Sequence, residues 1–179
     1  MTNGLRAVVT VVMLMAMGLP HAQAAPRQLT ISNDGNLRFG SFAVFDDAYR
    51  IVSPSGAVQS SGLFSITNGD TAPARFTIRY DRGNASRRRL DLRIQLVLSA
   101  APVVTQGGIV ARLTSYTTDL PRAGVVQAGR VIEVDIPNCV QRICSTSFAV
   151  GARLDIRRNF GGGDIEIPIP VDAVLISVR

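Results

Sequence analysis

The sequence predicts an all-β protein built as an antiparallel β-sandwich, and three observations carry this prediction. Apolar and polar residues alternate through most of the chain with the period of two that a strand with one buried face requires. Combinations of Gly, Pro, Asn and Asp separate these stretches at short intervals. Beyond residue 24 no stretch has the apolar spacing of an amphipathic helix. We therefore expect roughly nine or ten short strands in two packed sheets.

Three segments show the alternation most clearly, at residues 75–81, 90–98 and 147–158. In each of them apolar side chains point to one face, while arginine, aspartate, threonine or glutamine points to the other. Such strands need a second sheet against which to bury their apolar faces. The expected turns between strands lie at residues 33–35, 53–56, 68–70, 82–84, 106–108 and 161–163.

The two ends of the mature chain each carry a feature that bears on strand pairing. Residues 27–32 present Leu29 and Ile31 as alternate apolar side chains. They are expected to form an ordinary first strand or, alternatively, a strand donated to another chain. Near the other end, Pro168 and Pro170 lack the backbone N–H that a central strand needs, so an edge strand or a bend is expected there.

The first segment of the chain differs from the rest. An apolar run over residues 7–19 follows a positively charged start and precedes a small-residue Ala-Gln-Ala pattern. A membrane-spanning helix needs roughly 18 to 20 apolar residues, so this run has the length of a secretory signal. We predict a helical signal peptide over residues 1–24, cleaved near Ala24 and Ala25, with a retained anchor as the alternative.

Residues 25–179 are expected to form a single domain. They amount to about 155 residues, which fits one domain and suffices to bury a core. No second apolar run of membrane-spanning length follows the signal peptide. The mature chain is therefore expected to be exported and not inserted stably in a membrane.

Cys139 and Cys144 are the two cysteines of the chain. Export places them in an oxidising compartment, where thiols pair. A redox motif spaces its cysteines by two residues, whereas four separate this pair, and a structural zinc site needs four ligands. Because the flanking segments both alternate, we predict a hairpin with residues 140–143 as its loop and a disulfide across its base. A redox pair is the alternative.

The sequence does not favour catalysis. The sole histidine, His21, lies in the signal peptide, and the mature chain has neither lysine nor a third cysteine, so the usual general bases and nucleophiles are missing. Asp46 and Asp47 are neighbours that are expected to cap a turn before Tyr49. We expect no enzymatic activity, no cofactor and no metal site. Nucleic acid is not expected as a partner, since export separates the protein from it and no recognition motif occurs.

Arginine supplies every basic side chain. Without Arg6, 18 arginines face 13 acidic residues, so the mature net charge is about +5. Arginine can grip phosphate or carboxylate groups through paired hydrogen bonds. A candidate anion-binding patch, with a solvated surface as the alternative, consists of Arg82, Arg87, Arg88, Arg89, Arg157 and Arg158.

Several segments together resemble a family of exported bacterial proteins known as domain of unknown function 4402 (DUF4402). They are LRFGSF at 37–42, SPSG at 53–56, ARFTI at 74–78, FAVGARLDI at 148–156 and the terminal GGGDIEI and VLISV. The resemblance extends from about Leu37 to Val178 and implies an immunoglobulin-like or pilin-like sandwich in the periplasm or on the surface of a Gram-negative bacterium. The family has no established activity.

Two functions follow as hypotheses. The first is a structural or surface-associated component that pairs by its edge strands with other copies of itself or with another surface subunit. The alternative is a binding module that holds an anionic glycan or lipopolysaccharide through the arginine patch.

Overall fold

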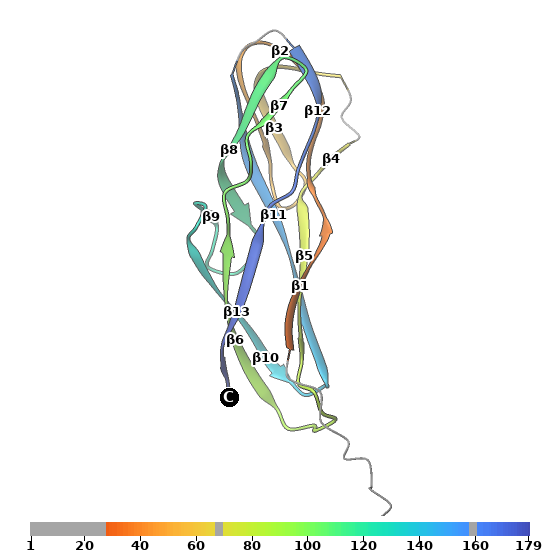
Figure 1. Ribbon diagram of the computed structural model, residues 1–179, viewed down its shortest axis with the longest axis vertical. Helices are drawn as coiled ribbons and strands as arrows, with labels where there is room; N and C mark the ends of the chain where they lie inside the picture. Colours follow the sequence, from red (N-terminus) through yellow and green to blue (C-terminus); the bar gives the residue numbers. More distant parts are fainter. Residues whose placement is uncertain (1–27, 67–69, 158–160) are drawn as a thin grey trace, which may run out of the picture.

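The computed structural model describes residues 28–66, 70–157 and 161–179, and it confirms the predicted antiparallel β-sandwich (Figure 1). The predicted signal peptide and its cleavage site lie outside these ranges. Within them all regular structure is strand, in two antiparallel sheets, and no helix is long and apolar enough to cross a membrane.

Thirteen strands occur in the described part of the chain, more than the nine or ten expected. Their bounds are β1 (Gln28–Gly35), β2 (Leu37–Val52), β3 (Val58–Ser65), β4 (Thr71–Ala72), β5 (Ala74–Asp81), β6 (Leu90–Leu98), β7 (Val104–Gln106), β8 (Ile109–Thr118), β9 (Val125–Val126), β10 (Val131–Cys139), β11 (Ile143–Arg157), β12 (Gly161–Ile167) and β13 (Val171–Val178).

The strands are divided unequally between the sheets. Ten form the larger sheet, which runs β1-β5-β11-β2-β12. Strands β3 and β4 pair with β2, and β8 pairs with β11 and also with β7 and β9. The remaining three form the smaller sheet, in the order β10-β6-β13. Figure 1 shows β2 and β12 in the upper part of the elongated molecule, and β1 and β13 in the lower part.

The core lies between the sheets and is lined by the apolar faces predicted from the alternation. The inward residues of β5, β6 and β11 are almost all fully buried. Phe76 of β5 and Phe148 of β11 stack with ring centres 5.4 Å apart. Each fully buried Leu, Ile, Val or Phe contributes about 1.5–3 kcal/mol to stability, so these faces hold the sheets together.

Strand β2 corrects the expected turn before Tyr49. The strand runs through Asp46 and Asp47, and its pairing with β3 shifts register between Val44 and Tyr49. Gly62 of β3 takes φ +74°, and a Cβ at this position would lie 2.6 Å from the Asp47 carbonyl oxygen. The chain therefore stays in paired strands with an irregular register, and a glycine lets the two backbones approach closely.

A second correction concerns residues 161–163, which were expected to form a hairpin turn. They begin β12 and pair with Val44, Ala43 and Phe42 of β2. A Cβ on Gly161 would overlap the Gly107 carbonyl oxygen, and one on Gly162 would overlap that of Phe42. Glycine serves here for the close packing of neighbouring backbones, one of the uses of glycine within a strand.

Two of the other expected turns are confirmed. Residues 53–56 form a hairpin turn in which the Gly56 N–H donates to the Ser53 carbonyl at 2.9 Å. Residues 106–108 connect β7 to β8. The turn expected at residues 33–35 is wrong, since these are the last three residues of β1, where the pairing with β5 is irregular. Most of 68–70 lies outside the described residues.

The segment containing Pro168 and Pro170 forms the predicted bend. It connects β12 in the larger sheet to β13 in the smaller one. The Pro170 carbonyl accepts a hydrogen bond from the Ser99 N–H at 2.9 Å, which ties the bend to the end of β6. The final strand β13 thereby becomes an edge of the smaller sheet.

Candidate functional site

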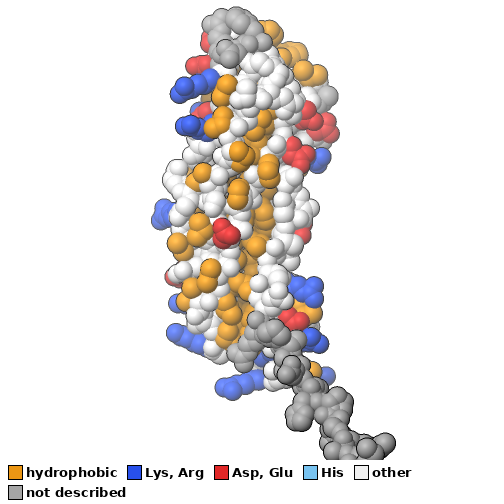
Figure 2. Space-filling view, viewed as in Figure 1, with side chains coloured by type: hydrophobic (Ala, Val, Ile, Leu, Met, Phe, Trp, Pro, Cys, Tyr) orange, Lys and Arg blue, Asp and Glu red, His pale blue; other side chains and the backbone are white. Residues whose placement is uncertain are grey.

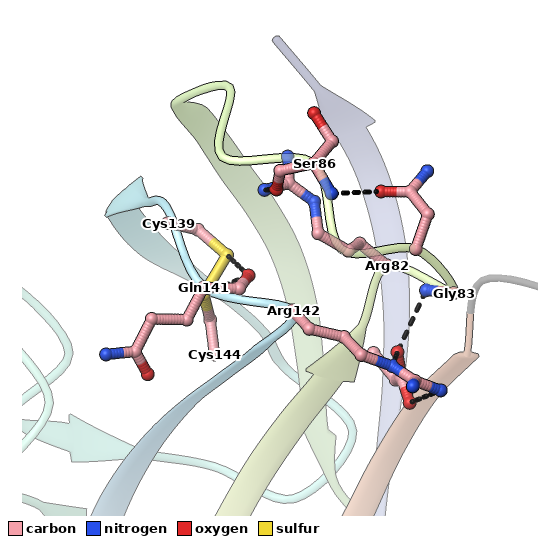
Figure 3. A network of polar contacts seen from close by, with 9 residues as sticks. Arg82, Gly83, Ser86, Cys139, Gln141, Arg142 and Cys144 are labelled. Carbon is pink, nitrogen blue, oxygen red and sulfur yellow. Dashed lines mark hydrogen bonds and ion pairs between the residues drawn. A yellow bond between two sulfur atoms is a disulfide. The ribbon is translucent and has the colours of Figure 1, made fainter.

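The Cys139–Cys144 disulfide is present, with the two Cα atoms 5.8 Å apart, but it does not close a hairpin. Cys139 ends β10 in the smaller sheet and pairs with Leu90. Cys144 is the second residue of β11 in the larger sheet and pairs with Tyr80. The bond therefore joins the two sheets where the chain crosses between them (Figure 3).

The hairpin prediction failed for a physical reason. The alternation shows that β10 and β11 each bury one face. The same alternation is found when two strands are neighbours in one sheet and when they lie in two sheets on either side of a core. Here they lie in different sheets, since β10 pairs with β6 and β11 with β5. Sequence alone did not separate these two arrangements.

Arg82 is a structural residue of the loop that connects β5 to β6. Its side chain is buried, and its two terminal nitrogens donate to the carbonyls of Ser86 at 2.6 Å and Arg88 at 2.8 Å. Figure 3 shows Arg82 pointing into this loop beside Ser86. Residues 82–89, called the arginine loop below, are thus held in shape by one of their own arginines, which is not available to a ligand.

The other predicted patch residues do not gather in one place. Arg87, Arg88 and Arg89 are exposed in the arginine loop, and no ion pair to them occurs among the described residues. Arg157 ends β11, whose first residue Ile143 pairs with Asp81. At a rise of about 3.3 Å per residue the two ends of this strand lie roughly 45 Å apart. Arg158 lies outside the described residues.

Asp81 anchors the beginning of the arginine loop. One carboxylate oxygen accepts from the Gly83 N–H at 2.8 Å and from Arg142 Nε at 3.2 Å. The hydrogen bond from the Gly83 backbone, with those from Arg142 and the positive charges of Arg142 and Arg79, lowers the pKa of Asp81. The carboxylate therefore stays ionised in this arginine-rich surrounding.

A seam runs along the long side of the molecule where the first and last parts of the chain meet. In its upper part β2 and β12 are paired, down to Leu37 opposite Ile167. Beyond this pair the two segments continue as β1 and β13. These strands lie close to each other, yet within the described residues β1 pairs only with β5 and β13 only with β6. The seam is hydrogen-bonded above and open below.

The open seam, meaning the gap between β1 and β13, has apolar borders. Leu29 and Ile31 of β1, and Ala173 and Leu175 of β13, are partly buried against the core. Figure 2 shows hydrophobic side chains in a stripe along the long axis, in the view in which Figure 1 places β1 and β13 side by side. Two unpaired strand edges with apolar side chains between them form a surface on which another strand can pair.

The arginine loop connects β5 and β6, the strands with which β1 and β13 pair. Asp81, just before the loop, pairs with Gln28 of β1. Asp91, just after it, exchanges backbone hydrogen bonds with Arg179 beyond β13, at 2.8 and 3.0 Å. The loop therefore crosses the lower end of the open seam, and Figure 2 shows arginine side chains around that end.

Residues 28–32 of the candidate donor segment lie in β1, with Leu29 opposite Tyr80 and Ile31 opposite Ile78 of the same chain. This is the arrangement of an ordinary first strand. Sequence reasoning missed the open seam itself. A signal was available in β13, where Val174 and Ile176 are exposed although the strand alternates, so that both of its faces are apolar.

The described residues contain no group of three or more His, Cys, Asp or Glu side chains that could hold a metal ion. The chemistry at the open seam is that of backbone N–H and C=O groups, apolar side chains and arginine.

Fold and site define an all-β sandwich with an open edge. The chain belongs to the family described as domain of unknown function (DUF4402), whose model matches residues 29–173. No curated protein matches the chain. No solved structure matches it either.

Proposed function

We propose that this protein is an exported, non-enzymatic structural or surface-associated subunit that accepts an extended segment of a neighbouring subunit at its open seam. The observation that carries the proposal is the change in pairing at Leu37 and Ile167, above which the seam is hydrogen-bonded and below which it is not. A strand added there would complete a sandwich that already encloses its core elsewhere.

Backbone geometry at the end of β13 supports the proposal. Arg179 exchanges both of its backbone hydrogen bonds with Asp91. In an antiparallel pair such residues alternate with residues whose N–H and C=O point away from the partner. The N–H and C=O of Val178 therefore point away from β6, toward the open edge, where an incoming strand can bond to them.

The side chains at the seam support it as well. Leu29, Ile31 and Leu175 are only partly buried, although they pack against the core. An incoming strand with alternating apolar side chains would remove the rest of their surface from water, which favours binding by about 25 cal/mol for each Å² buried. Such a strand would also protect two edges that are otherwise prone to unspecific pairing.

The proposal can be tested by site-specific cross-linking in the cell envelope. A photoreactive amino acid at position 178 is expected to give a discrete adduct, and fragment mass spectrometry is expected to map the attached residues to one extended segment of a subunit. The same amino acid at Val131, exposed on β10 at the opposite edge of the smaller sheet, is the matched control and is expected to give no such adduct.

A second variant separates strand pairing from mere proximity. Val178→Pro removes the outward N–H but leaves the hydrogen bonds of Arg179 to Asp91 in place, so the adduct formed from a neighbouring position of β13 is expected to disappear. Far-ultraviolet circular dichroism and urea unfolding would verify that the variant folds. Absence of adducts from position 178, or adducts unaffected by proline, contradicts the proposal.

A binding module for anionic glycan or lipopolysaccharide is the second candidate function. It is supported by three consecutive exposed arginines, Arg87 to Arg89, without ion pairs among the described residues. The expected result is salt-sensitive binding of purified lipopolysaccharide that is lost when these three are replaced by Gln. Binding that persists in this variant would contradict it.

A further inference from the structure

The arginine loop and the open seam are parts of one site in the fold. The loop leaves β5 beside the first residue of β1 and enters β6 beside the last residue of the chain. A strand lying in the seam would thus have one of its ends at this loop. The charge of the loop consequently acts on one end of the incoming strand, while the middle of that strand meets the apolar side chains of β1 and β13.

The charge at this end is strongly positive. Arg87, Arg88 and Arg89 are exposed and lack ion pairs within residues 28–66, 70–157 and 161–179. Of the two carboxylates beside the loop, Asp81 is paired with Arg142, and Asp91 accepts from the Asn138 N–H at 2.8 Å. A backbone N–H leaves the charge of Asp91 in place, so one carboxylate stands against these three arginines. Free positive charge therefore dominates the lower mouth of the seam.

The loop that carries this charge is also held in shape. Arg82 bonds to two carbonyls across the loop, and the Asn84 side chain accepts from the Ser86 N–H at 3.2 Å. The backbone that carries Arg87 to Arg89 is thus set before anything binds, at the end of the sandwich where Asp81 pairs with β1 and Asp91 bonds to Arg179. A backbone held in place loses less entropy when a partner arrives.

We propose that the segment accepted by the open seam is a strand with alternating apolar side chains that carries acidic residues at the end beneath the arginine loop. The proposal rests on the proposed function and adds the chemistry of the partner. Apolar side chains between β1 and β13 provide affinity. The three arginines select the partner and its register, because a basic end placed there would leave like charges together.

The test uses labelled eight-residue peptides, which match the length of β1 and of β13, and fluorescence anisotropy on the mature protein. All peptides share an alternating valine and threonine body and differ in one end, which carries aspartates, serines or lysines. Each is made with the variable end at either terminus, so that both strand directions are covered. A further peptide joins the aspartates to a flexible glycine and serine body.

The aspartate-ended peptide is expected to bind most tightly and the lysine-ended one least. Exposed charge pairs contribute little individually, so three together are expected to change Kd about tenfold at ~0.1 M salt, and less at ~0.5 M. Replacing Arg87, Arg88 and Arg89 together by Gln is expected to make the three alternating peptides bind equally. Replacing the exposed Arg112, Arg130 and Arg157 by Gln alters the net charge by the same amount and is expected to leave the preference intact.

The outcomes separate this inference from the proposed function. Equal binding of the aspartate, serine and lysine peptides overturns the acidic end but leaves strand acceptance in place. Binding of the flexible acidic peptide as tightly as the alternating one overturns the joint site, because charge alone would then suffice. Failure of every alternating peptide to bind counts against both, provided that urea unfolding shows a folded protein.

Discussion

The guanidinium carbon of Arg50 lies 5.7 Å from the centre of the Phe42 ring, and both side chains are buried on β2. Arg50 is 1% exposed, and its Nε and Nη1 atoms have no hydrogen-bond partner in the part of the chain that the structure describes. Burial lowers the pKa of Arg50, because the charged form loses its hydration.

Replacing Arg50 by Met should therefore stabilise the fold. A cation over an aromatic ring contributes up to about 2 kcal/mol, whereas removing an unpaired charge from water costs several kcal/mol. We expect Arg50→Met to raise the free energy of unfolding by roughly 1–3 kcal/mol in urea titrations. Arg112→Met, at an exposed position, is the control and should change it by less than about 0.5 kcal/mol. A large loss with Arg50→Met would mean that the guanidinium has an acceptor.

The disulfide should act as a modest clamp between the sheets. It closes a short loop, since Cys139 and Cys144 are five positions apart in the sequence. The chain-entropy relation gives about 2 kcal/mol for a loop of this size. We expect the double variant Cys139→Ser, Cys144→Ser to lose about that much in urea unfolding. Reduced wild-type protein should unfold at the same urea concentration as the variant. A loss far larger than this would show that the inter-sheet crossing cannot form without the bond.

Asp81 should make stability depend on pH at the acidic end. Its pKa is lowered in the fold, chiefly by the Gly83 N–H and by Arg142. A lowered folded-state pKa means that the contribution is complete above the ordinary pKa of a carboxyl group and is lost as the pH falls through the lowered value. Asp81→Asn should flatten this part of the curve of unfolding free energy against pH. An unchanged acid limb in the variant would show that other carboxylates cause it.

Two neighbouring glycines of β12 should respond differently to the same change. A Cβ on Gly162 would overlap the backbone of Phe42, whereas one on Gly163 would meet only the Gln106 side chain at 3.5 Å. We expect Gly162→Ala to cost at least about 2 kcal/mol, and Gly163→Ala to change stability by less than about 1 kcal/mol, both by thermal or urea unfolding. Equal effects would mean that β2 and β12 can move apart.

The sequence was informative wherever a property depends on neighbours along the chain. The alternation at residues 75–81, 90–98 and 147–158 correctly predicted which faces are buried, since side-chain direction in a strand follows from position alone. The bend at Pro168 and Pro170 followed from the missing N–H of proline. The prediction of a turn at residues 161–163 was wrong. A run of glycines permits both a turn and a tightly packed strand, and only the strands that pack beside it in the fold distinguish the two.

The candidate site was predictable only in pieces. Cys139 and Cys144 were correctly paired, but the sheets that they join were not foreseen. Arg82 and Arg157 were placed in one patch with the exposed arginines, whereas the first is buried and the second lies at the far end of β11. The sequence does not show which end of a long strand lies beside a given loop, so the distance from Arg157 to the arginine loop was not predictable.

By itself, the sequence determined that this is an all-β chain with two apolar-faced layers, a paired cysteine bridge and a family membership. Only the tertiary structure decided that β1 and β13 come together unpaired beneath a hydrogen-bonded seam, with an arginine loop across its end. The physical reason is that burial of a face is a local pattern, whereas pairing of an edge depends on which distant strand arrives beside it.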